Sequence, residues 1–304
     1  MSKFMVAGFI QMETIVKVKE LPLSFKPFCS EEDIINLNVG GTGYNEAVAL
    51  RWLGNDVDFM SMVGKEFALE QYKHVLDPAE LDLNMNYVLP VLDAMPHAIV
   101  LYAEDGQTQT FEDLKCIRHT EYDYDLFEKR IQDKDMVLVS SCNFCRPLLE
   151  LAKKYHKPVA VNVRSMRKEK VIEKADFIRE ADILYISDDD LDKTPYECLE
   201  DCKKIGNPKI VIIGLGDKGV LLYSAKEGSV LEYKPVKTNE VVNTVGAGNA
   251  MFSAFLHYYV KTGDEREAVK NALLFASYKI GFVGTSIGFM TEEQIEQWKP
   301  LIWK

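Results

Sequence analysis

The second half of the chain alternates short, mostly apolar runs with helical patterns. Strands buried on both faces appear in a sequence as nearly continuous apolar runs, and helices that connect such strands make the strands parallel. The apolar runs lie at residues 136–140, 159–163, 183–186 and 209–213, and helical patterns lie between them at 147–156, 168–175 and 196–205. This alternation predicts an α/β protein whose central sheet is mostly parallel and covered by helices on both faces.

The remaining segments extend this prediction. We expect strands at 4–10 and 57–62 and helices at 45–53, 66–76, 249–260, 265–280 and 291–298. Two stretches, at about 13–37 and 87–111, alternate polar and apolar residues around a turn at 104–106, which is typical of antiparallel strands. No linker rich in Pro, Gly or Ser divides the chain, so we predict a single domain over 1–304 with a small β lid inserted in it.

Charge and cysteine content exclude several classes of partner. The chain has 304 residues, and 36 Lys and Arg against 47 Asp and Glu give a net charge of −11. A nucleic-acid or anionic-membrane partner requires a basic surplus, so we expect neither, although a local pocket can still bind an anion. The first apolar run is too short for a secretory signal, and six cysteines then fit reduced thiols. We therefore expect a cytoplasmic protein.

Three glycine clusters precede strands or helices. The first, GGTGYN at 40–45, opens a helix and is either a tight turn or a ligand-binding loop, because free N–H groups at a helix start favour polar or anionic ligands. The second, GLGDKG at 214–219, matches GxGxxG. A dinucleotide fingerprint must open a helix, but residues 220–224 (VLLYS) have the pattern of a strand. This excludes an NAD-dependent dehydrogenase and leaves a hairpin, with a nucleotide lying against it as the alternative.

The third cluster, TVGAGN at 244–249, enters an apolar helix. Small residues at a helix start leave backbone N–H groups unpaired, and these form a cradle for an oxyanion or a phosphate group. The chain contains no Gly-Lys-Ser/Thr ending of a Walker loop, so phosphate binding here would differ from that of P-loop proteins.

Taken in order, these segments resemble the PfkB (ribokinase-like) family of sugar and nucleoside kinases. The resemblance rests on GFIQME at 8–13, on GGTGYN followed by EAVALRWLG and MVG at 62–64, on residues 212–219, and on NTVGAGN at 243–249. It implies a ribokinase-like three-layer α/β/α sandwich with a β-sheet lid that can also form a homodimer interface. It further implies ATP with Mg²⁺, a monovalent cation such as K⁺, and a sugar or nucleoside as substrate.

The resemblance also implies roles for individual residues. Those assigned to the sugar or nucleoside are Glu13, Gly41, Thr42 and Asn45. Those assigned to ATP and the cation loop are Ser187, Gly214, Gly216, Gly219 and Asn243. The backbone amides that would stabilise the transferred phosphoryl group belong to Gly246, Ala247 and Gly248, Arg164 would meet a phosphate, and Asp190 would meet the metal.

Several functional positions depart from the family pattern. Asn249 stands where the family has the Asp that takes the proton from the attacking hydroxyl, and an amide cannot accept that proton at neutral pH. A positioned base typically contributes about 10²–10⁴ in rate. At other positions Glu13, Asn243 and Ala160 each stand where the family has Asp, and Gly214 stands where it has Thr. Ser187 and Asp190 stand where the family has the Asn and the Glu of its Asn-x-x-Glu motif.

Two hypotheses follow from these departures. In the first, the chain is an ATP-dependent kinase acting on a primary hydroxyl, with weak or altered activity, and Asn249 orients that hydroxyl. Glu13 or Asp190 would then be the candidate replacement bases. In the second, the chain is a pseudokinase that binds a sugar, a nucleoside or a nucleotide as a sensor or a partner subunit.

Overall fold

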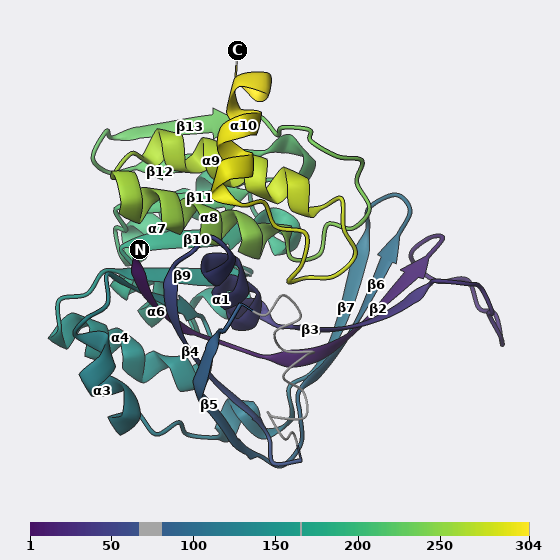
Figure 1. The fold of residues 1–304 in the computed structure, drawn as a ribbon, viewed down its shortest axis with the longest axis horizontal. Helices are drawn as coiled ribbons and strands as arrows, with labels where there is room; N and C mark the ends of the chain where they lie inside the picture. The colour runs from purple at the N-terminus through teal and green to yellow at the C-terminus, as the bar shows by residue number, and fades with distance from the viewer. Residues whose placement is uncertain (67–80, 165, 304) are drawn as a thin grey trace.

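A nine-stranded sheet forms the centre of the molecule (Figure 1). The computed structural model describes residues 1–66, 81–164 and 166–303. The strand order is β13 (Ser229–Tyr233), β12 (Val220–Ser224), β11 (Ile210–Gly214), β10 (Ile183–Ser187), β9 (Val159–Arg164), β8 (Met136–Ser140), β1 (Lys3–Ala7), β4 (Asp56–Gly64) and β5 (Asn84–Leu92). Only β11–β12 and β12–β13 pair antiparallel. The predicted, mostly parallel sheet is confirmed.

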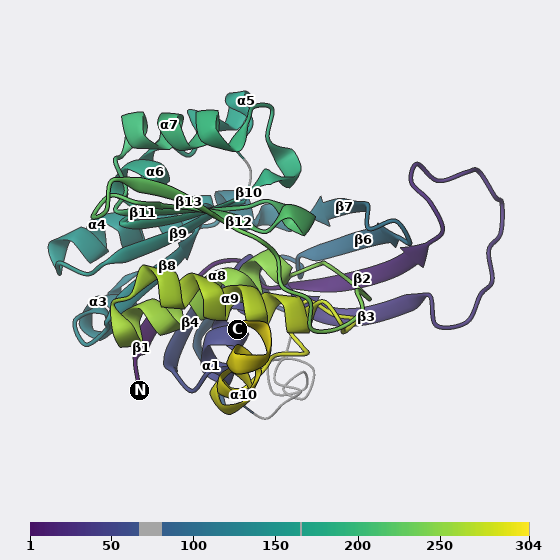
Figure 2. The ribbon, with the colours of Figure 1, turned by 90° about the horizontal axis from the view of Figure 1, so that it is seen from above.

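Helices cover both faces of this sheet, and Figure 2 shows α6 and α7 on one side and α8 and α9 on the other. One face packs against α1 (Thr42–Trp52), α8 (Ala247–Thr262), α9 (Glu265–Lys279) and α10 (Glu292–Ile302). The other packs against α3 (Asp125–Ile131), α4 (Arg146–Lys154), α6 (Ala175–Glu180) and α7 (Pro195–Ile205). Successive residues of β1 alternate between the two cores, Val6 in the first and Ala7 in the second. This is the three-layer α/β/α architecture.

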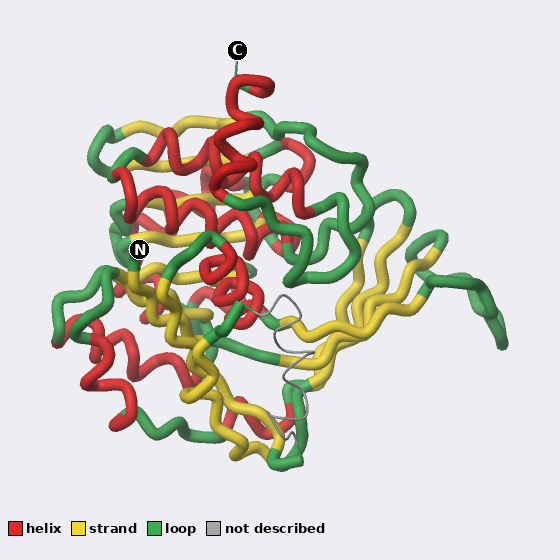
Figure 3. Tube along the Cα trace, in the orientation of Figure 1, coloured by secondary structure: helices red, strands yellow, loops and turns green. Residues whose placement is uncertain are grey.

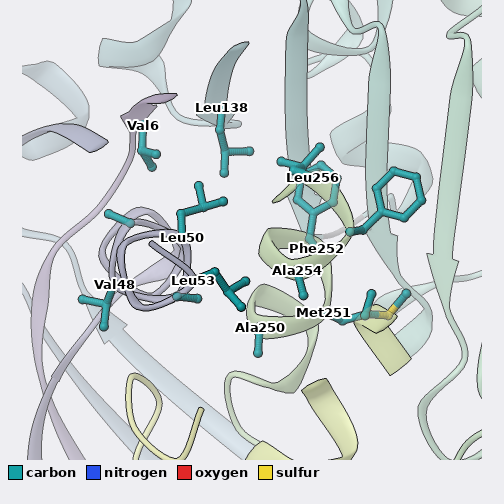
Figure 4. Packing of buried hydrophobic residues seen from close by; sticks show 14 of the residues in the cluster. Val6, Val48, Leu50, Leu53, Leu138, Ala250, Met251, Phe252, Ala254 and Leu256 are labelled. Carbon is teal, nitrogen blue, oxygen red and sulfur yellow. The ribbon is translucent and has the colours of Figure 1, made fainter. Parts of the chain in front are cut away.

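The packing of α1 against α8 positions the candidate site. Figure 4 shows apolar side chains of both helices meeting beneath the sheet, among them Leu50, Leu53, Ala250, Phe252 and Ala254, with Val6 and Leu138 above them. All of these residues are buried. Because each helix begins at one of the predicted glycine loops, this packing brings the first and third loops to the same edge of the sheet.

A second sheet of four strands projects from one side of the molecule (Figure 3). Its order is β3 (Ile35–Gly40), β2 (Gln11–Val18), β6 (His97–Ala103) and β7 (Thr108–Asp113). The pairs β2–β3 and β6–β7 are antiparallel as expected, whereas β2 and β6 are parallel. The stretch predicted at 87–111 divides, because β5 pairs with β4 at the edge of the main sheet and buries Val88 and Leu92 there.

Most predicted helices are present within about three residues of their expected bounds. The helix expected at 168–175 is instead two short ones, α5 (Lys168–Val171) and α6, separated by a turn, and α3 was not predicted. The helix expected at 66–76 lies almost wholly outside the described residues. In the described part of the chain, no helix has the length and apolarity needed to cross a membrane.

Candidate active site

Helix starts divide into two kinds in this structure. At α7, α9 and α10, the side chains of Thr194, Asp264 and Thr291 accept hydrogen bonds from the first backbone N–H groups. No side chain caps α1, α3, α4, α5, α6 or α8, and of these α1 and α8 are the ones preceded by a glycine of positive φ, Gly41 and Gly246. In α1 the N–H of Tyr44 bonds the carbonyl oxygen of Phe9, and in α8 the N–H of Ala247 bonds that of Thr244, each at 3.1 Å. The other first N–H groups of these two helices have no side-chain cap and suit an anionic or polar ligand.

The glycines of the third loop are required by close neighbours. Gly246 has a φ of 83°, and a Cβ atom there would lie 2.7 Å from the carbonyl oxygen of Thr285. A Cβ on Gly248 would lie 2.5 Å from the hydroxyl of Tyr185, and one on Gly214 would lie 2.7 Å from the same oxygen. The Tyr185 hydroxyl thus sits where the second and third glycine loops approach each other. The buried Tyr185 ring stacks on Phe252 of α8.

The second glycine loop is a hairpin turn, as predicted. It joins β11 to β12, and Gly216 and Gly219 have φ values of 57° and 100°. Because β12 follows where a dinucleotide site would have a helix, the exclusion of an NAD fingerprint is confirmed. Next to this loop, Ser187 ends β10 and donates from Oγ to Asp189 Oδ2 at 2.8 Å. The backbone of Asp190 ends the short helical turn that follows Ser187, and its side chain lies outside the described residues.

Glu13 lies in β2 and holds the first glycine loop. Its Oε1 accepts hydrogen bonds from the backbone N–H of Gly41 and from Gln11 Nε2, both at 3.0 Å, and its Oε2 accepts one from Thr285 Oγ1 at 2.9 Å. The carboxylate is 5% exposed, so three donors from three segments satisfy it inside the protein. These bonds connect the small sheet, α1 and the loop before α10.

Two further residues of the first loop were predicted to bind substrate. Asn45 is 3% exposed, and its Oδ1 has no hydrogen-bond partner in the described part of the chain. Thr42 begins α1 and is half-buried. An unsatisfied buried acceptor is costly, so Asn45 Oδ1 is a group that a ligand hydroxyl would satisfy.

A buried lysine lies under the third loop. Asn243 Oδ1 accepts from the N–H of Val245 at 2.8 Å, and the carbonyl oxygen of Val245 accepts from Lys279 Nζ. Lys279 is fully buried, and burial lowers its pKa to about 7 against the opposing charge of Glu13. The Lys279 amino group, which is about half protonated at neutral pH, thus bonds the loop that leads into the α8 N-terminus.

Asn249 is hydrogen-bonded to Asn162, which in turn bonds Glu46, and both of these residues lie far from Asn249 in the sequence. Asn162 Nδ2, on β9, donates to Asn249 Oδ1 at 3.1 Å and to Glu46 Oε1 at 2.7 Å. The other end of the amide, Asn162 Oδ1, accepts from the backbone N–H of Arg164 at 3.1 Å. Because a backbone N–H can only donate, it fixes the orientation of the Asn162 amide. The oxygen of Asn249 is thereby engaged, and its NH₂ group is left for a ligand.

Glu46 is a carboxyl group buried beside this contact. Its side chain is 0% exposed, and Oε2 has no hydrogen-bond partner among the described residues. Burial raises the pKa of Glu46 to about 8, and the hydrogen bond from Asn162 opposes that rise only in part. At neutral pH most of this carboxyl is protonated.

Arg164 links the main sheet to the small one. It ends β9 with a φ of 61°, and its Nη1 lies 2.5 Å from Oε1 of Glu112 in β7. The guanidinium is more than half exposed, so a phosphate group can still approach it.

Comparison with known proteins assigns the chain to a family. The model of the pfkB family of carbohydrate kinases matches residues 1–292. The chain belongs to this family. Among curated relatives, the deoxyribokinase of Salmonella typhi is 34% identical over 91 residues, which are 30% of this chain and 29% of that protein. The ribokinase of Dictyostelium discoideum is 22% identical over 95% of this chain and 98% of its own length.

Solved structures share the pfkB fold over nearly the whole chain. A microbiome-derived acarbose kinase superposes with a TM-score of 0.80 at 22% identity and covers 97% of this chain and 98% of its own. The Arabidopsis thaliana ribokinase, complexed with ribose and ATP, gives 0.77 at 19% identity, with 98% of both chains covered. A Burkholderia thailandensis nucleoside kinase in complex with inosine gives 0.78 at 18% identity, with 99% of both covered.

Four residues at this candidate site were given no role in the prediction from the sequence. They are Glu46, Asn162, Tyr185 and Lys279, all of which are nearly or fully buried. Glu46 and Lys279 could have been noticed because each is a charged residue at a helix position that faces the core. The other two belong to β-strands, where a single polar atom does not identify a ligand site.

Proposed function

We propose that this pfkB family member transfers a phosphoryl group from ATP to a primary hydroxyl of a sugar or a nucleoside. The observation that carries the proposal is the pair of uncapped helix N-termini, α1 at Gly41 and α8 at Gly246, next to each other at one sheet edge. The N-terminus of α1 suits the hydroxyls of the acceptor, and the N-terminus of α8 suits the oxygens of the transferred phosphoryl group.

ATP would lie along the second and third loops. Gly214 and Gly248 both lie against the Tyr185 hydroxyl, which a Cβ atom at either position would approach within 2.7 Å, so this hydroxyl marks the junction of the two loops along which the phosphate chain would pass. The proposed nucleotide contacts are Ser187, Gly214, Gly216, Gly219 and Asn243. No group of three acidic, His or Cys side chains suitable for a metal occurs in the described part of the chain. Mg²⁺ would be held by the phosphates together with Asp190, whose side chain lies outside the described residues.

The acceptor would lie between the first loop and the small sheet. Asn45 offers an unsatisfied buried acceptor, Gly41 and Thr42 begin α1, and Glu13 holds this loop in place. Relatives and neighbours named for ribose, deoxyribose, cytidine and inosine support a pentose or a pentose-containing nucleoside as the substrate class.

The proposed chemistry is mostly electrostatic. Backbone amides of Gly246, Ala247 and Gly248 would stabilise the charge on the phosphoryl oxygens, and Arg164 would add a cation on the side facing β7. Phosphoryl transfer depends chiefly on positioning and charge stabilisation. The loss of the family base at Asn249 would consequently slow the reaction without removing its main source of acceleration.

A second candidate is a pseudokinase that binds the same ligands. The orientation of Asn249 favours it, since the amide oxygen is engaged by Asn162 and only hydrogen-bond donors remain for the ligand. Such a site would bind an already anionic group better than it would deprotonate a hydroxyl.

We also propose that the small sheet forms a homodimer interface. Its apolar side chains at Ile35, Leu37, Ile99 and Phe111 are between 47% and 74% exposed. A second copy of the chain would cover them, and sedimentation or light scattering at micromolar concentration would report a dimer.

Thermal shift against ATP, ADP and a panel of sugars and nucleosides would identify the ligand pair, and ADP release on that pair would test turnover. ADP formation that depends on the acceptor supports the kinase. Stabilisation by a nucleotide and an acceptor without turnover supports the pseudokinase. If neither stabilisation nor turnover were observed, the kinase and the pseudokinase proposals would both be contradicted.

A further inference from the structure

A carboxyl group lies directly behind the residue that replaces the family base. Glu46 Oε1 and Asn249 Oδ1 share the same donor, Asn162 Nδ2, at 2.7 and 3.1 Å. Two oxygens bound to one nitrogen lie at most about two hydrogen-bond lengths apart, so the Glu46 carboxyl lies within that distance of the Asn249 amide oxygen. The three side chains come from α1, β9 and α8, and their contact depends on the packing of both helices against the sheet.

We propose that Glu46 is the proton acceptor of the phosphoryl transfer, in place of the carboxylate missing at Asn249. This inference rests on the proposed kinase function. Asn249 would orient the attacking hydroxyl, and Asn162 would hold Asn249 and Glu46 at a fixed separation. The family Asp orients the hydroxyl and accepts its proton. Here these two functions would be divided between Asn249, whose amide faces the ligand, and Glu46, whose carboxyl lies behind it.

A structural role alone accounts poorly for a carboxyl at this position. Burying a carboxylate oxygen without a hydrogen-bond partner is costly, and Glu46 Oε2 has none in the described part of the chain. A glutamine of the same shape would receive the Asn162 hydrogen bond equally well and would bring no titratable group into the core. A buried acid whose pKa lies near the working pH is the property that a general base requires.

The proposed step balances in atoms and charge. The acceptor hydroxyl oxygen forms a bond to the γ-phosphorus of ATP, and the bond from that phosphorus to the β,γ-bridging oxygen breaks. The hydroxyl proton passes by way of water to the Glu46 carboxylate, and ADP leaves. The proton returns to solvent when the products are released.

The neighbours of Glu46 do not titrate near neutral pH, so a pH dependence of activity in that range would report the ionisation of Glu46 itself. Two titratable groups whose pKa the charge of Glu46 raises are Cys145, at the N-cap of α4, and Tyr185 of β10. Burial raises the pKa of each well above neutrality, so both stay neutral between pH 6 and 9. From the packed α8 face, Ser253 and Asn249 are uncharged neighbours.

The test compares Glu46→Gln, Glu46→Gln/Asn249→Asp and the wild type, with Ser253→Ala as a matched control. Ser253 is fully buried in α8 and bonds the backbone oxygen of Glu46 at 3.4 Å, so its loss disturbs the same packing without touching the carboxyl. We expect Glu46→Gln to lower kcat about 100-fold or more with little change in KM. Restoring the carboxylate at position 249 should raise kcat at least tenfold above that of Glu46→Gln. The kcat of Ser253→Ala should stay within threefold of the wild-type value.

The pH profile supplies a readout that a structural role would not change. Wild-type kcat/KM should rise with pH to an inflection near 8, because Glu46 must be ionised. In the double variant the inflection should move to lower pH, because position 249 is half-buried while Glu46 is fully buried. Thermal unfolding at pH 8 should show Glu46→Gln at least as stable as wild type.

Each other outcome overturns the inference. Glu46→Gln with kcat within threefold of wild type, or a double variant no faster than the single one, would exclude Glu46 as the acceptor while leaving the kinase function intact. A wild-type chain that turns over no acceptor would overturn both the kinase function and this inference.

Discussion

The ammonium of Lys279 donates a hydrogen bond to the carbonyl oxygen of Val245, one residue before the glycine that begins α8. A lysine that is fully buried lowers the stability of the folded chain, because its charged form loses hydration. Lys279 contacts the loop that would receive phosphate, so in its protonated form, which predominates below pH about 7, it would place a positive charge beside the bound anion.

Lys279→Met should raise stability and lower activity. The folded pKa of about 7 lies below the ordinary 10.5, so the unfolded chain binds more protons between these values and wild-type stability rises with pH there. The stability advantage of Lys279→Met should therefore be largest near pH 7 and shrink towards pH 10. Chemical denaturation at both pH values measures this, and an advantage that does not change with pH would contradict the assignment.

The Lys279 ammonium also bears on the monovalent cation expected beside Asn243. If the ammonium supplies the charge of this loop, turnover in buffers of KCl, NaCl or a bulky organic cation should agree within about twofold. Lys279→Met should make the rate depend on K⁺. A wild-type rate that already rises severalfold with K⁺ would show that the loop binds an ion in addition to Lys279.

Tyr185→Phe tests the contact between the second and third loops. The variant keeps the ring that stacks on Phe252 and removes only the hydroxyl beside Gly214 and Gly248. A hydrogen bond to a charged phosphate oxygen is worth about 1.5–3 kcal/mol, so KM for ATP should rise about tenfold or more. KM for the acceptor should not change. Equal effects on both substrates would place the hydroxyl elsewhere than at the nucleotide.

Glu13→Gln should loosen the first loop. The carboxylate accepts from Gly41, Gln11 and Thr285, and an amide nitrogen would face at least one of these donors. Leaving a buried donor unsatisfied costs about 1–3 kcal/mol, so the unfolding free energy should fall by that amount and KM for the acceptor should rise. Thr285→Val removes one donor and should have the smaller effect. If Thr285→Val were the more damaging of the two, Glu13 would not be the centre of this network.

The main sheet and the glycine loops could be predicted because their causes are local. Apolar runs such as 136–140 and 209–213 indicate strands buried on both faces, and the positive φ values at Gly41 and Gly246 require glycine. The division of the 87–111 stretch could not be predicted in this way. Its first strand pairs with β4 at the main sheet and not with its neighbour in sequence.

The contacts around Asn249 depend on tertiary packing. Asn162 is 116 positions from Glu46 and 87 from Asn249, and only the packing of α1 and α8 against the sheet brings them together. The same holds for Arg164, which the sequence associates with phosphate and which the structure also joins to Glu112 of the small sheet. The family motif shows that Asn249 replaces an Asp. That Glu46 lies close enough to Asn249 to be proposed as a substitute carboxyl is seen only in the folded chain.

The central claim is that this chain transfers a phosphoryl group, and direct detection of the product tests it most closely. The protein would be incubated with ATP, Mg²⁺ and each acceptor that stabilises it, and the mixture would be analysed by mass spectrometry. We predict an acceptor heavier by one phosphoryl group, formed in equal amount with ADP. ADP without a phosphorylated acceptor, or unchanged ATP beside a bound acceptor, would contradict the account.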